Sequence, residues 1–187
     1  MPKKNDRRKA KVFRPKEQFI IRRAEKGDGR GVIDFFNLAT ERGINKYGGM
    51  NRPSDPRERV GLDRRYSLHQ RNLFEFVAVD KLNGKIVGHC SFHARADGRT
   101  RHLGEVGWGL HPDYLGRGIA TELLKAVLKE AVKRGFVRAE ASIAVRNKKS
   151  LALARRCGFK IEGRGKWGML LDDGTYVDTI YLAKILK

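Results

Sequence analysis

The clearest structural pattern in the chain runs Gly104-Glu-Val-Gly-Trp-Gly-Leu-His-Pro-Asp-Tyr-Leu-Gly-Arg-Gly-Ile-Ala-Thr-Glu-Leu-Leu-Lys125. It predicts a strand, then a turn that contains Gly116 and Gly118, then an amphipathic helix. Such a turn can point several backbone N–H groups at one spot, and the positive end of the helix dipole adds to the potential there. The stretch therefore predicts a site for a phosphate or pyrophosphate group.

Length and composition limit the class of protein. The 187 residues suit a single domain with a real core, and no apolar run approaches the ~20 residues of a membrane span. The two cysteines, Cys90 and Cys157, form neither a disulfide framework nor a metal quartet. His89 and Cys90 would point to opposite faces of a strand, so we expect no metal site. The N-terminus lacks the apolar segment of a signal peptide, which favours a cytoplasmic protein with no membrane partner.

The net charge of +20 is concentrated in part at the N-terminus. Residues 1–17 have no hydrophobic period and predict a flexible basic tail ahead of one domain at 18–187. A basic surface favours polyanions such as RNA, and the alternative is a solvated, ion-paired surface. The tail residues expected to contact nucleic acid are Lys3, Lys4, Arg7, Arg8, Lys9, Lys11, Arg14 and Lys16.

The rest of the chain predicts an α/β sheet of mixed direction. The expected strands are 18–23, 74–80, 85–94, 103–110, 139–145 and a last β region that follows Phe159 and includes 174–183. The expected helices are 28–42, one from Pro56 toward 70, 116–134 and 148–156. Asn83-Gly84 predicts a hairpin turn between two of these strands.

This order, with the phosphate turn after the fourth strand, resembles the GNAT-type N-acetyltransferases. The acyl-CoA signature of that family, Gln/Arg-x-x-Gly-x-Gly/Ala, falls on Leu115-Gly-Arg-Gly118-Ile-Ala120, with Leu115 in place of the usual Gln or Arg. A second match is Asn147, followed by Cys157-Gly158-Phe159. The closing segment, 159–178, is similar to the subgroup that includes ribosomal-protein N-terminal acetyltransferases and spermidine-type acetyltransferases. The resemblance covers 18–187 and implies an α/β (α+β) fold, with a mixed sheet of about six to seven strands flanked by about four helices.

The resemblance also implies acetyl-CoA as the co-substrate. The strand before the turn is expected to separate from its neighbour and to expose backbone groups to the pantetheine arm. The residues implied to contact acetyl-CoA are Trp108, Leu110, His111, Leu115, Gly116, Arg117, Gly118, Ile119, Ala120, Thr121 and Asn147. The alternatives are a plain strand-to-helix turn and, for Asn147, a helix cap.

The implied reaction is direct attack of an amine on acetyl-CoA, which needs a base and an acid. Glu105, at the start of the fourth strand, is the expected base acting through water, and the alternative is a surface Glu paired with an Arg. His111, at the strand end beside the turn, is a second candidate for the base, and its alternative is a loop histidine with no role. Many relatives place a Tyr acid where this chain has Ala154. Ser150 matches the Ser of the ribosomal-protein subgroup and is the expected donor to the thiolate. The alternative for Ser150 is a first-turn serine bonded to the backbone.

The charge of the chain bears on the acceptor. A basic enzyme repels cationic substrates at long range unless a local acidic pocket, such as one formed by Asp172, Asp173 and Asp178, receives them. A basic tail on rRNA would instead raise the effective concentration of a ribosomal protein's N-terminus. We therefore expect acetylation of a protein N-terminus. The alternatives are a ribosome- or RNA-associated protein of this fold with little or no catalysis, and an acetyltransferase for small-molecule amines or amino acids.

Overall fold

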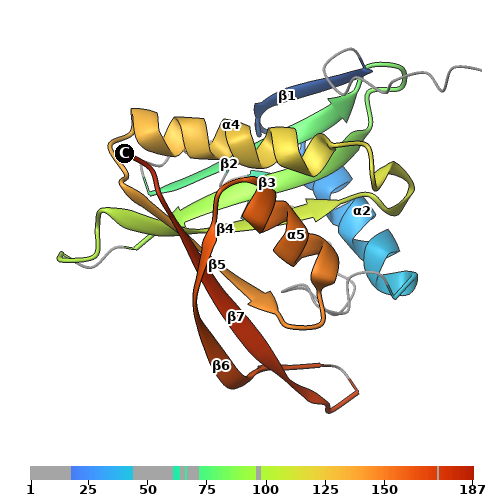
Figure 1. Cartoon of the computed structure of the whole chain (residues 1–187). Coiled ribbons are helices and arrows are strands. Elements are labelled where there is room, and N and C mark those ends of the chain that lie inside the picture. Colours follow the sequence, from blue (N-terminus) through green and yellow to red (C-terminus); the bar gives the residue numbers. More distant parts are fainter. Residues whose placement is uncertain (1–17, 44–60, 64–65, 67–71, 96–97, 172) are drawn as a thin grey trace, which may run out of the picture.

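The computed structural model describes residues 18–43, 61–63, 66, 72–95, 98–171 and 173–187. The tail at 1–17 and most of the helix predicted from Pro56 toward 70 lie outside these residues. In chain order, the described elements in Figure 1 are β1 (Phe19–Arg23), α2 (Gly29–Glu41), β2 (Leu73–Asp80), β3 (Ile86–Ala94), β4 (Leu103–Leu110), the 3₁₀ turn η1 (Pro112–Tyr114), α4 (Ile119–Lys133), β5 (Arg138–Ala144), α5 (Lys148–Arg156), β6 (Lys160–Leu170) and β7 (Tyr176–Ile185).

The strands form one seven-stranded mixed sheet with the order β1-β2-β3-β4-β5-β7-β6. β4 and β5 run parallel, and the other neighbouring strands run antiparallel. Each of the first five strands begins within one residue of its predicted position. The predicted last β region is the hairpin of β6 and β7, with Gly174 at a φ of +78° in its turn. The mixed α/β sheet predicted from the sequence is confirmed.

The helices divide between the two faces of this sheet, because alternate residues of a strand point to opposite sides. Val77 packs with Val32 and Phe35 of α2. Its neighbour Ala78 belongs to the larger core cluster, to which α4 and α5 both contribute. Accordingly, α2 covers one face of the sheet, and α4 and α5 cover the other, as Figure 1 shows.

His89 and Cys90, neighbours on β3, point to opposite faces as predicted. Cys90 is buried in the larger cluster, whereas the His89 ring meets Phe36 of α2 edge-on, with 6.2 Å between ring centroids. Among the described residues, no group of three or more His, Cys, Asp or Glu is placed to hold a metal ion. In the same part of the chain, no helix has both the length and the apolar composition needed to cross a membrane.

The helix predicted at 116–134 is shorter than expected at its N-terminus. Gly116 and Gly118 have φ angles of +77° and +76°, so both residues lie outside the right-handed helix, and α4 begins at Ile119. Val132, near the end of α4, is 49% exposed. At the other end Gly135, with a φ of +84°, terminates the helix within one residue of the predicted end.

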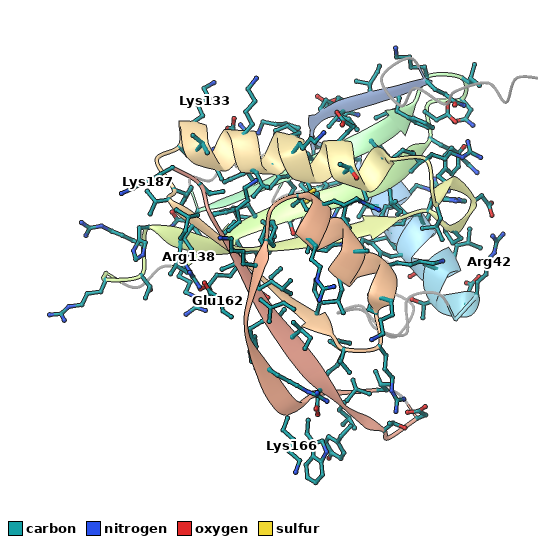
Figure 2. All side chains as sticks on the ribbon, in the orientation of Figure 1. Arg42, Lys133, Arg138, Glu162, Lys166 and Lys187 are labelled. Atoms are coloured by element: carbon teal, nitrogen blue, oxygen red, sulfur yellow. The ribbon has the colours of Figure 1, made fainter. Side chains whose placement is uncertain are left out.

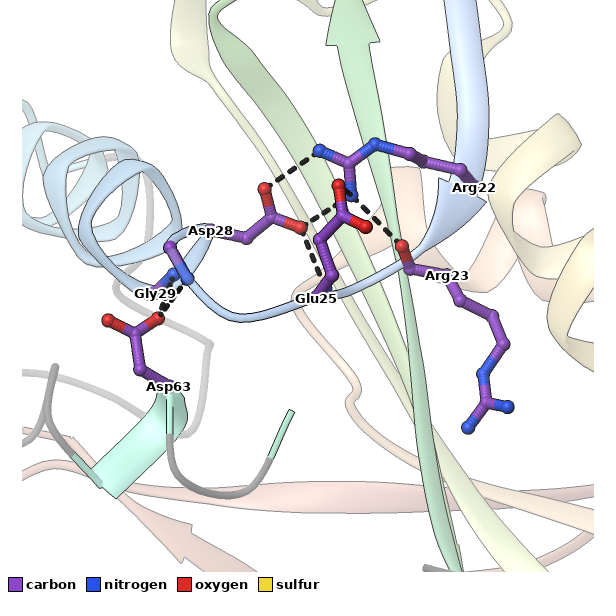
Figure 3. A network of polar contacts seen from close by, with 7 residues as sticks. Arg22, Arg23, Glu25, Asp28, Gly29 and Asp63 are labelled. Atoms are coloured by element: carbon purple, nitrogen blue, oxygen red, sulfur yellow. Dashed lines mark hydrogen bonds and ion pairs between the residues drawn. The ribbon is translucent and has the colours of Figure 1, made fainter. Parts of the chain in front are cut away.

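The connection from β1 to α2 is held by two aspartates (Figure 3). Both carboxylate oxygens of Asp28 accept hydrogen bonds from the Arg22 guanidinium, at 2.6 and 2.8 Å. The carboxylate of Asp63, which lies 34 residues beyond Gly29 in the sequence, accepts the backbone N–H groups of Gly27 and Gly29 at 3.1 and 2.9 Å. Asp63 therefore caps the first turn of α2 from a separate segment.

An ion network lies where β4 and β5 meet. Arg138 of β5 donates to Glu140, at 2.9 Å, and to Glu162 of β6, and Figure 2 shows Arg138 and Glu162 close to one another. Arg95, just beyond β3, donates to the same Glu140 at 3.0 Å. These hydrogen bonds raise the pKa of Arg138, the one to Glu162 most strongly. The network therefore joins the end of β3 to β5 and β6.

Candidate functional site

β4 and β5 separate after a short parallel contact. They pair at Leu103–Arg138, Gly104–Ala139 and Glu105–Glu140. Beyond these pairs β4 continues to Leu110 paired only with β3, while β5 stays paired with β7. The backbone of β4 from Val106 onward therefore has no strand partner on its β5 side. We call this opening the β4–β5 slot. The separation predicted at Trp108–Leu110 is present.

The slot leads into the turn from His111 to Gly118. Leu115 is extended, and Gly116 and Gly118 are both left-handed, which reverses the chain before α4. A Cβ added at Gly116 would meet no heavy atom within 4 Å, so the turn borders open space. Within the described chain, no side chain caps the start of α4. The backbone N–H of Thr121 donates to the carbonyl oxygen of Gly118 at 3.0 Å. The N–H groups that precede it at a helix start have no intrahelical partner and can bind an anion.

His111 and Asp113 anchor the first part of this turn. The His111 side chain is buried, and its Nδ1 accepts the backbone N–H of Asp113 at 3.2 Å. Burial lowers the pKa of His111, although the carboxylate of Asp113 opposes the change. Asp113 also accepts the Arg42 guanidinium at 2.6 Å, and this hydrogen bond lowers the pKa of Asp113. His111 thus holds Asp113 within the turn, and the contact of Asp113 with Arg42 ties the turn to the end of α2.

Tyr114 and Arg117 anchor the second part. The Tyr114 hydroxyl donates to the buried carboxylate of Asp80 at 2.9 Å. The guanidinium of Arg117 lies over the Tyr114 ring, 4.8 Å from its centroid, and donates to the carbonyl oxygen of Asp113 at 3.1 Å. Arg117 therefore contributes a positive charge that is held against the turn.

Asn147 and Ser150 lie at the start of α5. The Asn147 side chain accepts the backbone N–H of Ser150 at 3.1 Å, so the helix-cap role is present. The Ser150 hydroxyl oxygen accepts the indole N–H of Trp108 at 3.3 Å. Ala154 is fully buried in the core. The structure thus brings Trp108, Ser150 and Asn147 together beside the slot.

Glu105 occupies the last paired position before the slot. It is exposed and stands in register with His93 of β3 and with Glu140 of β5. Glu140 is bound by Arg95 and Arg138, whereas Glu105 makes no ion pair with any residue that the structure describes. Strand alternation places Glu105 on the α2 face of β4, opposite the side chain of Trp108.

Two of the three aspartates considered for a cationic acceptor have partners in the β6–β7 hairpin. Asp178 accepts the backbone N–H of Trp167 at 2.9 Å and the Arg164 guanidinium at 2.7 Å. Asp173 accepts the backbone N–H of Thr175 at 2.9 Å, as expected of a hairpin turn. Asp172 lies outside the described residues. These contacts give Asp173 and Asp178 structural roles within the β6–β7 hairpin.

The contacts that the sequence did not predict join residues far apart in the chain. Trp108 and Ser150 are 42 residues apart, Tyr114 and Asp80 are 34 apart, and Arg42 and Asp113 are 71 apart. These pairs link β4 to α5, the 3₁₀ turn η1 to β2, and the end of α2 to η1. In the sequence, Trp108 and Tyr114 stand out as aromatic side chains with a polar group close to the predicted phosphate turn. Their residue types indicate that they form hydrogen bonds, but do not indicate with which residues.

The chain matches a known family. The family model described as "Acetyltransferase (GNAT) domain" matches residues 18–160. The chain therefore belongs to the GNAT acetyltransferase family.

Individual relatives differ in their acceptors. The chain is 29% identical to the L-amino acid N-acetyltransferase AaaT of Escherichia coli K12 over 105 residues, which are 56% of this chain and 64% of AaaT, so it spans less than two thirds of that relative. The ribosomal-protein-alanine N-acetyltransferase of Brucella melitensis is 26% identical, with a TM-score of 0.76 over 89% of this chain and 99% of that one. The fold also matches yncA of Salmonella typhimurium, solved with its cofactor acetyl-CoA, at a TM-score of 0.77, 23% identity and coverage of 91% and 95%.

Proposed function

We propose that this protein transfers the acetyl group of acetyl-CoA to a primary amine by direct attack. The observation that carries the proposal is the β4–β5 slot, which leads into a turn with two left-handed glycines at a helix start. Unpaired strand backbone suits the amide groups of a pantetheine arm, and the helix start suits a pyrophosphate. Membership of the GNAT family supports the same reaction.

The residues proposed to hold acetyl-CoA follow the slot and the turn. They are Trp108, Leu110 and His111 at the strand end, Leu115, Gly116, Arg117, Gly118, Ile119, Ala120 and Thr121 in the turn and first helical turn, and Asn147 at the start of α5. Leu115 replaces the Gln or Arg usual in the family. Because backbone N–H groups bind the pyrophosphate, this replacement leaves the main contacts in place.

Acetyl-CoA supplies an acetyl group activated as a thioester: the amine nitrogen bonds to the acetyl carbon, the bond from that carbon to sulfur breaks, and CoA leaves as a thiolate. Glu105 accepts, through water, the proton that the attacking amine releases. Ser150 donates a hydrogen bond beside the slot, where negative charge collects as the sulfur departs. Glu105 and Ser150 lie on opposite sides of β4, so proton removal and hydrogen-bond donation occur from opposite faces.

The proposed acceptor is a protein N-terminus, such as that of a ribosomal protein, in the cytoplasm. The Brucella melitensis relative and the closing segment of the sequence support this acceptor. The +20 charge supports a docking role for the basic tail, residues 1–16, on rRNA. A second candidate acceptor, an L-amino acid, is favoured by the 29% identity with AaaT.

Calorimetric titration of acetyl-CoA tests the first part of the proposal. We expect wild-type protein, free of nucleic acid, to bind acetyl-CoA in the micromolar range and Gly118→Glu to lose binding. Gly135→Glu is a matched control, because Gly135 also has a positive φ, at the far end of α4, with no heavy atom within 4 Å of an added Cβ. No binding to folded wild type, or equal loss in both variants, would refute the proposed site.

An acceptor panel tests the second part. Peptides with ribosomal-protein N-termini and free L-amino acids are compared by kcat/KM, with the acetylated nitrogen located by mass spectrometry. We expect higher kcat/KM for the peptides, and preference for the amino acids would select the second candidate. Binding of rRNA by full-length protein and by protein lacking residues 1–16 is compared across salt concentrations. Absence of salt-sensitive binding would refute tail docking.

A further inference from the structure

Trp108 makes a side-chain contact across the β4–β5 slot. Trp108 lies on β4 three residues beyond the last β4–β5 pair, and Ser150 lies in the first turn of α5. The indole Nε1 and the Ser150 Oγ are 3.3 Å apart. Both side chains are partly buried, and Trp108 packs against the larger core cluster. The contact therefore lies where the two strands have separated and the slot is open.

The chemistry of the two groups determines the direction of this hydrogen bond. An indole N–H is a donor only, so the serine oxygen must accept. The hydroxyl proton of Ser150 then remains available to another acceptor. The backbone N–H of Ser150 is bound by the Asn147 side chain at 3.1 Å, so both the backbone and the hydroxyl oxygen are held.

A serine in a helix commonly turns its hydroxyl toward a carbonyl oxygen one turn earlier. That arrangement would use the hydroxyl proton inside the helix. The indole of Trp108 holds the oxygen on the side of β4 instead, and the core contacts of the ring fix the position of the donor. Trp108 thus biases Ser150 toward a conformation that offers its proton to the slot.

We propose that the Trp108 side chain is a positioning group that orients the Ser150 hydroxyl as a hydrogen-bond donor to the sulfur of CoA. This role rests on the proposed function, in which Ser150 donates to the thiolate, and it goes beyond the backbone contact proposed for Trp108. The indole makes no contact with the sulfur itself and acts through Ser150.

Four variants test the role: Trp108→Phe, which keeps the ring and removes the N–H, Ser150→Ala, the double variant, and Trp167→Phe. Trp167 is the other tryptophan of the chain and is 65% exposed on β6, so its variant controls for the loss of an indole. Two measurements need no acceptor. The first is the NMR resonance of the Trp108 indole N–H. The second is the ionisation of the CoA thiol in the protein–CoA complex, followed by thiolate absorbance against pH.

We expect Ser150→Ala to shift the Trp108 indole resonance and to leave that of Trp167 in place. We expect Ser150→Ala to lower the acid dissociation constant of bound CoA about tenfold or more, because a hydrogen bond to a charged group is lost. Trp108→Phe should lower this constant about threefold to tenfold, and the double variant should match Ser150→Ala. When an acceptor amine is present, kcat should fall most in Ser150→Ala and in the double variant and less in Trp108→Phe. The Kd of CoA should change little.

Two results would overturn the positioning role. One is an indole resonance of Trp108 that does not respond to Ser150→Ala. The other is thiol ionisation in Trp108→Phe equal to that of wild type and of Trp167→Phe while Ser150→Ala is impaired. Absence of acetyl transfer by wild type would instead refute the proposed function, and the thiol measurement would still decide the role of Trp108.

Discussion

Gly88 of β3 packs closely against β4 and α4, the two elements that the turn containing Gly116 and Gly118 connects. A Cβ added at this position would lie 2.6 Å from Cδ2 of Leu110, the last residue of β4, and 2.8 Å from Cδ1 of Leu123 in α4. Carbon atoms pack at about 3.5–4.0 Å, so Gly88→Ala requires both leucines to move. The turn that we assign to the pyrophosphate connects the elements that carry these leucines.

The expected cost follows from how freely each neighbour can move. Leu123 is fully buried, whereas Leu110 is only partly buried and can adjust toward the slot. Overpacking of this kind costs about 1–3 kcal/mol, and we expect a loss of about 2 kcal/mol in the free energy of unfolding. For a chain of this size, that loss lowers Tm by roughly 4–8 °C. Displacement of Leu110 should also weaken acetyl-CoA binding.

Urea unfolding and thermal unfolding measure this loss, with Gly107→Ala as the matched control. Gly107 lies on the next strand, where an added Cβ would meet only the Ser91 hydroxyl, at an ordinary 3.5 Å. We expect Gly107→Ala to change stability by less than about 1 kcal/mol, with a gain from the less flexible unfolded chain. Equal stability of Gly88→Ala and wild type, or an equal loss in both variants, would refute the packing argument.

Three further substitutions test the contacts around the site. Asn147→Ala should lower the free energy of unfolding by about 0.5–2 kcal/mol in urea titration, and Asn147→Asp, which keeps a capping oxygen, should not. If Asn147 also binds acetyl-CoA, both variants bind it more weakly by calorimetry, and normal binding by both would exclude that second role. Tyr114→Phe should cost about 1–3 kcal/mol, because the buried Asp80 loses a donor, and an unchanged Tm would contradict this. Burial lowers the pKa of His111 in the folded protein below the ordinary 6.5, so the unfolded chain binds this proton more tightly. The contribution of neutral His111 to the free energy of unfolding is therefore complete above pH 6.5, and it is lost as the pH falls through the lower pKa of the folded state. The stability difference between wild type and His111→Asn, which keeps an acceptor for the turn, should therefore shrink below pH 6.5, and a difference independent of pH would contradict the pKa assignment.

The elements around the site could be predicted because their signals are local. Local sequence patterns predict the starts of α2, α5 and the first five strands within one residue of their observed positions. The cap at Asn147 is a contact with a residue three positions away, so its residue type alone indicates it. The start of α4 was predicted too early, because a glycine can either open a helix or adopt the left-handed conformation seen at Gly116 and Gly118.

The precise site geometry could not be predicted, because it depends on contacts between distant segments. The separation of β4 and β5 places Ser150 beside Trp108, and neither residue's neighbours in the sequence indicate this pairing. Asp63 caps α2 from a segment 34 residues away for the same reason. Residue type predicts which chemical groups the site can use. The topology of the sheet determines which of these groups contact one another.

The short contact between β4 and β5 also affects how the domain responds to a ligand. Within the sheet, three residue pairs connect β1–β4 to β5–β7, and in the described chain β4 and β5 are not paired beyond Glu105. A molecule that fills the slot contacts both parts and adds a connection that the sheet lacks. Its binding free energy then adds to the packing of the shared core that already holds these two parts together. Substrate binding should therefore make the domain more cooperative, with slower hydrogen exchange in β5–β7 than in the free protein.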